Sequence, residues 1–167
     1  MQNENKITKI YLASDHAGFE LKEKVKLYLI NNFDNLEITD FGASEYDEVD
    51  DYTRYMHKAG HDMSIDANSG LESRAIVFGG SGEGEAIVMN RYDGVRCTTY
   101  YGNNLDIIKL GREHNNANAI SFGARFVDYN ECIKAIEIFL NTEFTRGRHV
   151  FRVEQIDHKL GFLSRFF

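Results

Sequence analysis

The chain has 167 residues, of which 43% are hydrophobic and 27% charged, a composition typical of one soluble globular domain with a sizeable core. Its formal net charge of −7 makes nucleic acid and anionic membranes poor partners for the surface as a whole. No apolar run approaches membrane-spanning length, and the polar start MQNENKITK lacks the apolar core of a signal peptide. We therefore expect a cytoplasmic protein whose two cysteines, Cys97 and Cys132, are buried free thiols.

The chain alternates between short apolar runs of strand length and longer segments with the spacing of amphipathic helices. The expected strands are Lys9–Ser14, Leu36–Phe41, Ala75–Phe78, Val95–Tyr100 and Ala119–Phe122. The expected helices are Phe19–Asn31, Tyr52–Ile65, Glu83–Tyr92, Leu105–Arg112 and an apolar-striped segment through Leu140 that Asp128 caps. Residues 1–8 are expected to form a polar tail, and residues 150–167 a C-terminal helical extension.

Five strands that alternate with helices predict the α/β class. We expect a three-layer, Rossmann-like fold: a parallel sheet of order 2-1-3-4-5 with helices on both faces and a helix at the C-terminus. No repeat, linker or low-complexity stretch divides residues 1–167, so one domain is expected. In such sheets a ligand binds where the winding direction reverses, here at the carboxyl ends of strands one and three. The acidic segment Ala43–Asp51 is expected to be a solvated loop.

A glycine-rich loop follows the third strand, within the stretch RAIVFGGSGEGEAIVMN from Arg74 to Asn90. Its glycines let the backbone approach a ligand closely, and the N–H groups that open the next helix favour an anion. The loop lacks both the Gly-Lys-Ser/Thr of a P-loop and the G-x-G-x-x-G spacing of a dinucleotide site. Glu85 adds a carboxylate, as a site that stabilises an oxyanion and moves a proton would need. A tight βα turn with glycines for packing is the alternative.

The expected topology gathers four chemically active side chains beside this loop. Asp15 and His16 end the first strand, and Ser81 and Glu85 follow the third. A carboxylate, an imidazole, a hydroxyl and a second carboxylate would therefore share one cleft. This convergence favours a functional site over a packing turn.

Two further clusters lie later in the chain. His114 closes a helix, where it could serve a site or act only as a charge partner of the helix end. A basic cluster is unusual in an acidic chain, and its members are Arg125, Arg146, Arg148, His149 and Arg152. Guanidinium groups about one helical turn apart suit a phosphate monoester dianion. A solvated basic tail that pairs with acidic neighbours is the alternative.

Taken together, the motifs resemble the ribose-5-phosphate isomerase type B family, which includes the subunits of galactose-6-phosphate isomerase. The resemblance runs from about Lys9 to His158, through SDHAGFELK, the Asp51-Tyr52 pair, VFGGSGEGEAIVMNR, GVR, REHNNANAISFGAR and GRHVFRVEQI. It implies an aldose–ketose isomerase that interconverts ribose 5-phosphate and ribulose 5-phosphate through an enediolate. It also implies that the enzyme uses no metal and no organic cofactor.

The resemblance assigns roles to the candidate residues. Asp15 and His16 would contact the sugar, and His114 with Asp15 would assist ring opening. The enediolate oxygen would be held by Ser81 and by backbone N–H groups of the loop, at Gly80, Gly82 and Gly84. The phosphate would be bound by Arg125, Arg148, His149 and Arg152.

Family sites lie at a subunit interface, so the resemblance implies a homodimer or a dimer of dimers. His114, Asn115 and some phosphate ligands would then come from the partner chain. The apolar end Gly161–Phe167 is also expected to pack on a partner subunit.

One departure from the family pattern bears on the base. Many members carry a catalytic cysteine just before the glycine loop, where this chain has Gly79, while another branch uses a glutamate that Glu85 matches. We therefore expect Glu85 to shuttle the proton between C1 and C2. Glu83 in the loop, and Thr53 in place of a usual proline, leave sugar selectivity open. The alternatives are an isomerase of galactose 6-phosphate or allose 6-phosphate, a non-catalytic sugar-phosphate-binding protein and a flavodoxin-type nucleotide-binding domain.

Overall fold

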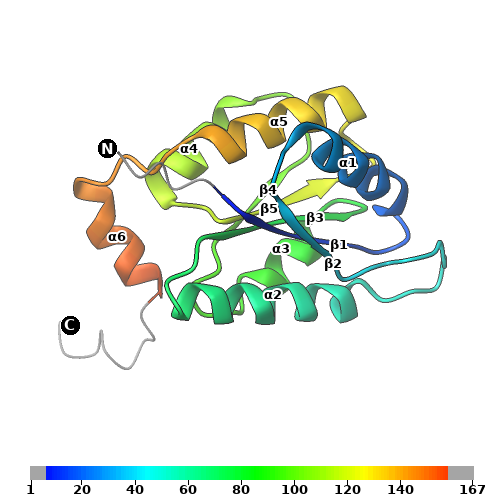
Figure 1. Ribbon diagram of the computed structural model, residues 1–167, viewed down its shortest axis with the longest axis horizontal. Helices are drawn as coiled ribbons and strands as arrows, with labels where there is room; N and C mark the ends of the chain where they lie inside the picture. The colour runs from blue at the N-terminus through cyan, green and yellow to red at the C-terminus, as the bar shows by residue number, and fades with distance from the viewer. Residues whose placement is uncertain (1–6, 158–167) are drawn as a thin grey trace.

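A parallel sheet of five strands lies between two layers of helices (Figure 1). The computed structural model describes residues 7–157. The strands are β1 (Lys9–Ser14), β2 (Glu37–Asp40), β3 (Ser73–Gly79), β4 (Cys97–Tyr100) and β5 (Ala119–Gly123). The helices are α1 (Phe19–Asn32), α2 (Tyr52–Asn68), α3 (Glu83–Met89), α4 (Asp106–Asn115), α5 (Tyr129–Asn141) and α6 (Arg148–Asp157). The predicted α/β class is therefore confirmed.

The central strands are apolar on both faces because helices cover both sides of the sheet. Alternate residues of β1 face opposite layers: Ile10 and Leu12 belong to the core under α1, α4 and α5, and Tyr11 and Ala13 to the core over α2 and α3. Figure 1 shows these two helix layers above and below the sheet. Burial of both strand faces explains why the strands read as continuous apolar runs in the sequence.

The order of the last two strands differs from the prediction. The sheet runs β2-β1-β3-β5-β4, so β5 pairs with β3 and β4 forms the edge, whereas the expected order was 2-1-3-4-5. Burial explains the difference: every residue of β5 is buried, while Cys97, Thr98 and Thr99 of β4 are only partly covered. The winding still reverses between β1 and β3, so the expected ligand crevice is unchanged.

Most helix and strand ends lie close to their predicted places. Helix α4 continues to Asn115, beyond the predicted end at Arg112. Asn116 follows as its C-terminal cap, in the left-handed conformation with φ 48°. Asp128 caps α5 as expected, because its carboxylate accepts the Glu131 N–H at 2.9 Å. Both cysteines are free, Cys132 buried and Cys97 partly buried. The expected packing of Gly161–Phe167 concerns residues outside the described range.

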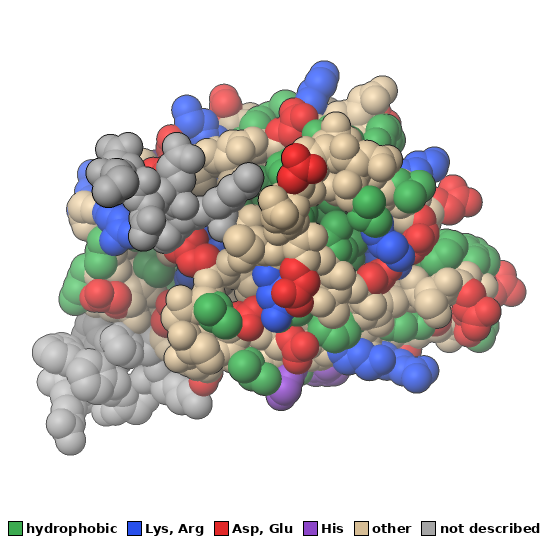
Figure 2. Space-filling view, viewed as in Figure 1, with side chains coloured by type: hydrophobic (Ala, Val, Ile, Leu, Met, Phe, Trp, Pro, Cys, Tyr) green, Lys and Arg blue, Asp and Glu red, His purple; other side chains and the backbone are tan. Residues whose placement is uncertain are grey.

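Helix α6 lies apart from both layers, at the left of Figure 1, beside the amino ends of the strands. The face seen in Figure 2 carries interspersed acidic and basic side chains, without a broad basic area. Between residues 7 and 157, no helix is both long and apolar enough to cross a membrane.

Candidate active site

Strands β1 and β3 end side by side at the carboxyl edge of the sheet, because Ser14 is in register with Phe78. Asp15 follows β1 directly, is buried, and accepts the Gly18 N–H at 3.1 Å. Gly18 packs so closely on the end of β3 that a Cβ there would lie 2.6 Å from the Phe78 carbonyl carbon. This contact holds the loop after β1 against the loop after β3.

Glu85 is buried in the first turns of α3, and its side chain points back to the end of β3. A Cβ at position 79 would lie 1.9 Å from Glu85 Oε1, so the carboxylate occupies the space that a side chain of residue 79 would fill. Burial raises the pKa of Glu85 above its ordinary value of 4.5, and the charge of Asp15 raises it further. The two carboxylates thus share one environment in the crevice.

The glycine loop bends back toward β5. Gly82 has φ +80°, and a Cβ there would lie 2.9 Å from the backbone of Phe122, so the turn requires glycine. The Gly82 carbonyl accepts the hydroxyl of Ser121 at 2.6 Å. Ser81 is exposed, and its hydroxyl accepts the Glu83 N–H at 3.4 Å. Ser81 therefore lies at the exposed surface of the glycine loop.

Arg125, just after β5, joins the same edge. Its N–H donates to the Gly80 carbonyl at 3.2 Å, and its guanidinium carbon lies 3.1 Å from where a Cβ of Gly80 would be. A cavity of 690 Å³ opens between Arg125 and His16, beside the start of α1. The structure therefore brings Asp15, His16 and Arg125 together with the glycine loop and Glu85.

His16 is held by a residue that sequence reasoning did not single out. Asp50 Oδ1 accepts the His16 backbone N–H at 3.0 Å and lies 2.7 Å from His16 Nδ1. This hydrogen bond raises the pKa of the His16 imidazole. Most of the acidic loop is exposed as expected, but Asp50 is not, since only 4% of its side chain is accessible. The sequence of this acidic loop has no periodic pattern from which the contact between Asp50 and His16 could be predicted.

Ligand atoms of Asp15, His16 and Asp50 lie within 4.8 Å of one another, a spacing that a cation could bridge. However, Nδ1 of His16 and Oδ1 of Asp50 are in direct hydrogen-bond contact at 2.7 Å. We therefore interpret these two atoms as a hydrogen-bonded pair beside Asp15.

The remaining predicted site residues lie at the opposite, amino edge of the sheet. His114 ends α4, and its ring stacks on that of His149 in α6 at a centroid distance of 4.3 Å and an angle of 7°. The pKa of His149 is lowered, first by burial and then by the neighbouring positive charges of His114, Arg148 and Arg152. Within one chain, His114, Asn115 and the basic residues of α6 are thus separated from Glu85 by the length of the strands.

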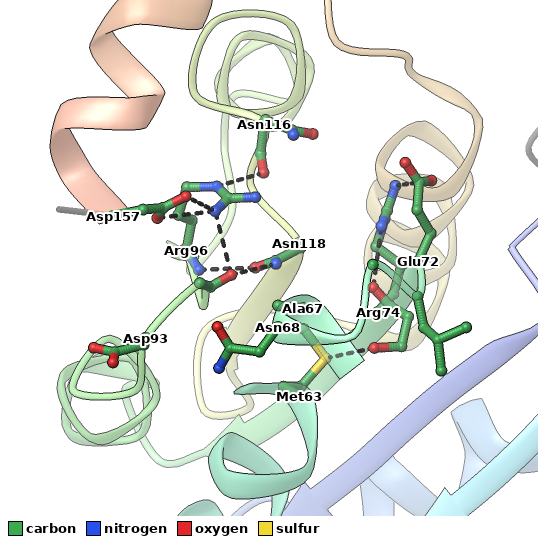
Figure 3. A pocket seen from close by; sticks show the side chains of 14 residues that line it. Met63, Ala67, Asn68, Glu72, Arg74, Asp93, Arg96, Asn116, Asn118 and Asp157 are labelled. Carbon is green, nitrogen blue, oxygen red and sulfur yellow. Dashed lines mark hydrogen bonds and ion pairs between the residues drawn. The ribbon is translucent and has the colours of Figure 1, made fainter. Parts of the chain in front are cut away.

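A pocket of 440 Å³ at the amino edge shows how α6 is anchored (Figure 3). Arg96, of the GVR motif, contacts Asp157 at 2.7 Å and donates to the Asn116 carbonyl at 3.0 Å. Its backbone N–H donates to the side chain of Asn118 at 2.8 Å. Arg96 therefore fixes the end of α6 against the loop that follows α4, and it supports His114 and His149 indirectly.

Arg96→Ala is expected to lower the free energy of unfolding by about 1–3 kcal/mol, because partly buried acceptors lose a charged donor. Lys109→Ala is the matched control: its contact with Glu113 is 3.8 Å long and exposed, so its loss is expected to cost less than about 0.5 kcal/mol. Urea denaturation of both variants measures the difference. Equal stability losses would contradict an anchoring role for Arg96.

Comparison with known proteins adds to this geometry. A model of the Ribose/Galactose Isomerase family matches residues 10–156. The chain belongs to the ribose/galactose isomerase family. The resemblance inferred from the motifs is therefore confirmed.

Two relatives in this family illustrate the extent of the match. Ribose-5-phosphate isomerase B of Mycolicibacterium paratuberculosis is 35% identical over 147 residues, which are 87% of each chain. The crystal structure of ribose-5-phosphate isomerase B from Mycoplasma genitalium with bound ribulose 5-phosphate superposes with a TM-score of 0.81. That structure is 30% identical and covers 89% of this chain and 93% of its own.

A solved ribose 5-phosphate isomerase from Thermotoga maritima is 38% identical, with a TM-score of 0.78. The match covers 90% of this chain and 97% of that one. The likeness therefore extends over most of the chain, in agreement with the family match over residues 10–156.

Proposed function

We propose that this protein is an aldose–ketose isomerase that interconverts ribose 5-phosphate and ribulose 5-phosphate through an enediolate, with Glu85 as the base. The observation that carries the proposal is the position of the Glu85 carboxylate. It is buried, lies against the backbone of Gly79 and shares the crevice with Asp15, beside the glycine loop and Arg125. Relatives named ribose-5-phosphate isomerase B, one of them with ribulose 5-phosphate bound, support the choice of substrate.

The chemistry follows from this arrangement. The Glu85 carboxylate takes the proton from C2 of the open-chain aldose, and negative charge develops on the oxygen at C1. Backbone N–H groups between Gly80 and Gly84, with the Ser81 hydroxyl, stabilise that oxyanion, and one such donor is worth roughly 3 kcal/mol. The proton of the C2 hydroxyl moves to the C1 oxygen, and Glu85 returns its own proton to C1, which leaves the carbonyl at C2 of the ketose. Asp15 and His16 contact the sugar, and binding of the phosphate by arginine residues positions the small reacting end.

The separation of the predicted residues within one chain supports a homodimer with shared sites. Asp15, Glu85 and Arg125 lie at the carboxyl edge, while His114, Asn115 and the phosphate ligands of α6 lie at the amino edge. If each crevice receives the amino-edge group of a partner, every predicted residue enters one site. A dimer of dimers would use the same contact. A cytoplasmic location agrees with two free thiols.

A substrate panel in deuterated water tests the proposed reaction. Purified protein is expected to convert ribose 5-phosphate to ribulose 5-phosphate and to exchange the C2 proton with solvent. Preferential turnover of galactose 6-phosphate or allose 6-phosphate would reassign the enzyme to six-carbon substrates. Binding without proton exchange would instead indicate a non-catalytic sugar-phosphate-binding protein.

Subunit mixing tests whether the site is shared. Glu85→Gln and His114→Ala homodimers are each expected to be nearly inactive, because each lacks one component of every site. After unfolding and refolding together in equal amounts, about a quarter of all sites should be intact, since half of the dimers are mixed and each holds one unaltered site. Activity that stays at the level of the separate variants would contradict sharing.

The raised pKa of Glu85 predicts the acid limb of the pH profile. Only the ionised carboxylate accepts a proton, so kcat falls as the pH drops through that pKa. We expect half-maximal kcat at a pH above 4.5, the ordinary value for the group, because burial disfavours the charged form. Stopped-assay rates at saturating substrate between pH 4 and pH 8, with folding monitored by circular dichroism, check this. Half-maximal kcat at pH 4.5 or below would contradict this prediction.

A further inference from the structure

The His16–Asp50 contact belongs to the carboxyl edge, yet none of the roles assigned above uses Asp50. One carboxylate oxygen of Asp50 receives both the backbone N–H of His16, at 3.0 Å, and the ring atom Nδ1, at 2.7 Å. The accessible fraction is 4% for the Asp50 side chain and 25% for that of His16. The Asp50 carboxylate is therefore almost fully enclosed, with Oδ1 bonded to His16, and the imidazole is the member of the pair that reaches solvent.

The acidic loop brings a second contact to the same ring. The Tyr46 ring meets the His16 ring edge to face, at a centroid distance of 6.1 Å and an angle of 86°. Tyr46 and His16 both line the 690 Å³ cavity that extends to Arg125. Two residues of one loop thus restrict the His16 ring from two directions, and the ring has little freedom to rotate.

The orientation of the ring decides its chemistry. A carboxylate at Nδ1 requires a proton on that nitrogen, so Nε2, on the far side of the ring, is the nitrogen available to a ligand. The neighbouring negative charge also favours the doubly protonated imidazolium, in which Nε2 carries a proton as well. An Nε2–H donor suits an oxygen atom of an anionic sugar phosphate, whereas a neutral ring with its proton on Nδ1 would only accept a hydrogen bond there.

We propose that Asp50 is a positioning residue of the isomerase site, which holds the His16 imidazole by Nδ1 so that Nε2–H donates to the substrate. This inference rests on the proposed function. The charged groups around His16 are Asp15 and Asp50, which favour its protonation, and Arg125, which opposes it. Asp15 and Arg125 stay in place when Asp50 alone is changed, so the effect of Asp50 can be isolated.

Asp50→Asn removes the negative charge beside His16 but keeps an oxygen acceptor at the same place, so it tests the role of the charge. The KM for ribose 5-phosphate is expected to rise about tenfold at a pH between 6.5, the ordinary histidine value, and the raised pKa of His16, because His16 without the Asp50 charge is neutral there and loses its Nε2–H donor. The increase should shrink at pH 6, where His16 protonates without help, and kcat should change less than KM. Asp47→Asn is the matched control, since this exposed carboxylate of the same loop accepts the Val49 N–H. Its KM is expected to equal that of the unaltered protein at both pH values.

A double-mutant cycle and NMR spectroscopy complete the test. In a His16→Ala background, Asp50→Asn is expected to have no further effect on KM, because the two residues act through one contact. Ring ¹⁵N shifts of the unaltered protein should show Nδ1 protonated, with titration above the ordinary histidine value of 6.5. Three results would overturn the proposal. They are a ratio of the KM of Asp50→Asn to that of the unaltered protein that does not change with pH, effects of His16→Ala and Asp50→Asn on KM that add in the double mutant, and a neutral His16 ring protonated at Nε2.

The outcomes separate this inference from the proposed function. If the unaltered protein does not isomerise ribose 5-phosphate, the proposed function fails, while the NMR titration still decides whether Asp50 sets the state of His16. If the protein is active but its KM ratio does not depend on pH, only the role of Asp50 is rejected. The NMR measurement on the unaltered protein also decides the question if Asp50→Asn does not fold.

Discussion

Glu85→Gln is expected to lower kcat by about 10²–10⁴-fold, the usual contribution of a general base. Glutamine keeps the shape of the side chain that fills the space over Gly79, so the fold and the bound position of the substrate should persist. KM is expected to change little. Coupled assays of kcat and KM, with thermal unfolding as a check of folding, measure the effect.

Glu83→Gln is the matched control, because Glu83 lies two positions earlier in the same helix but is exposed. It is expected to retain most of kcat. An active Glu85→Gln protein, or equal losses in the two variants, would remove Glu85 from the role of base. If the Glu85→Gln protein loses both turnover and exchange of the C2 proton, its defect lies in proton transfer rather than in product release.

Gly79→Ala is expected to reduce kcat by about 10²-fold or more, because it displaces Glu85, the proposed base. The new Cβ would lie 1.9 Å from Oε1 of Glu85, so the carboxylate must leave its place. Overpacking at this buried position should also cost about 1–3 kcal/mol of unfolding free energy. Activity and urea denaturation can be measured on the same preparation.

Gly111→Ala provides the control, since the nearest atom to a new Cβ there is 3.8 Å away and the residue lies inside α4. Its stability should be unchanged or higher, by up to about 1 kcal/mol, because alanine favours a helix. The double variant Gly79→Ala, Glu85→Ala should regain stability without regaining activity. A fully active Gly79→Ala protein would show that the carboxylate does not need its observed position.

Local chemistry explains what the sequence alone could predict. Apolar runs separated by glycine and polar turns located the five strands, and the position of the winding reversal then brought Asp15 and Glu85 to one crevice. The strand order could not be read in the same way, because β4 and β5 are both short runs. The partial exposure of Thr98 and Thr99 became a clear edge signal only in the folded sheet.

Long-range contacts set the limit of prediction at the site. Asp50 meets His16 across 34 positions of sequence, from a loop without periodicity, so no local pattern marks it. The stacking of His114 on His149 likewise depends on how α6 returns to the end of α4. Residue types indicated which side chains could serve the reaction, whereas only the folded chain showed which of them one subunit can bring together.

The contact between Glu85 and the backbone of Gly79 has an evolutionary consequence. The resemblance implies a cysteine base at position 79 in other branches of the family, and Glu85 is the base proposed for this chain. The two side chains would compete for the same volume, so one chain could not hold both in working geometry. A lineage that exchanges one base for the other must pass through an intermediate protein. That protein either carries both side chains in a space that fits one, or carries neither base. We therefore expect the two positions to change as a pair, and ancestral reconstruction should recover few chains that carry only one of the two replacements.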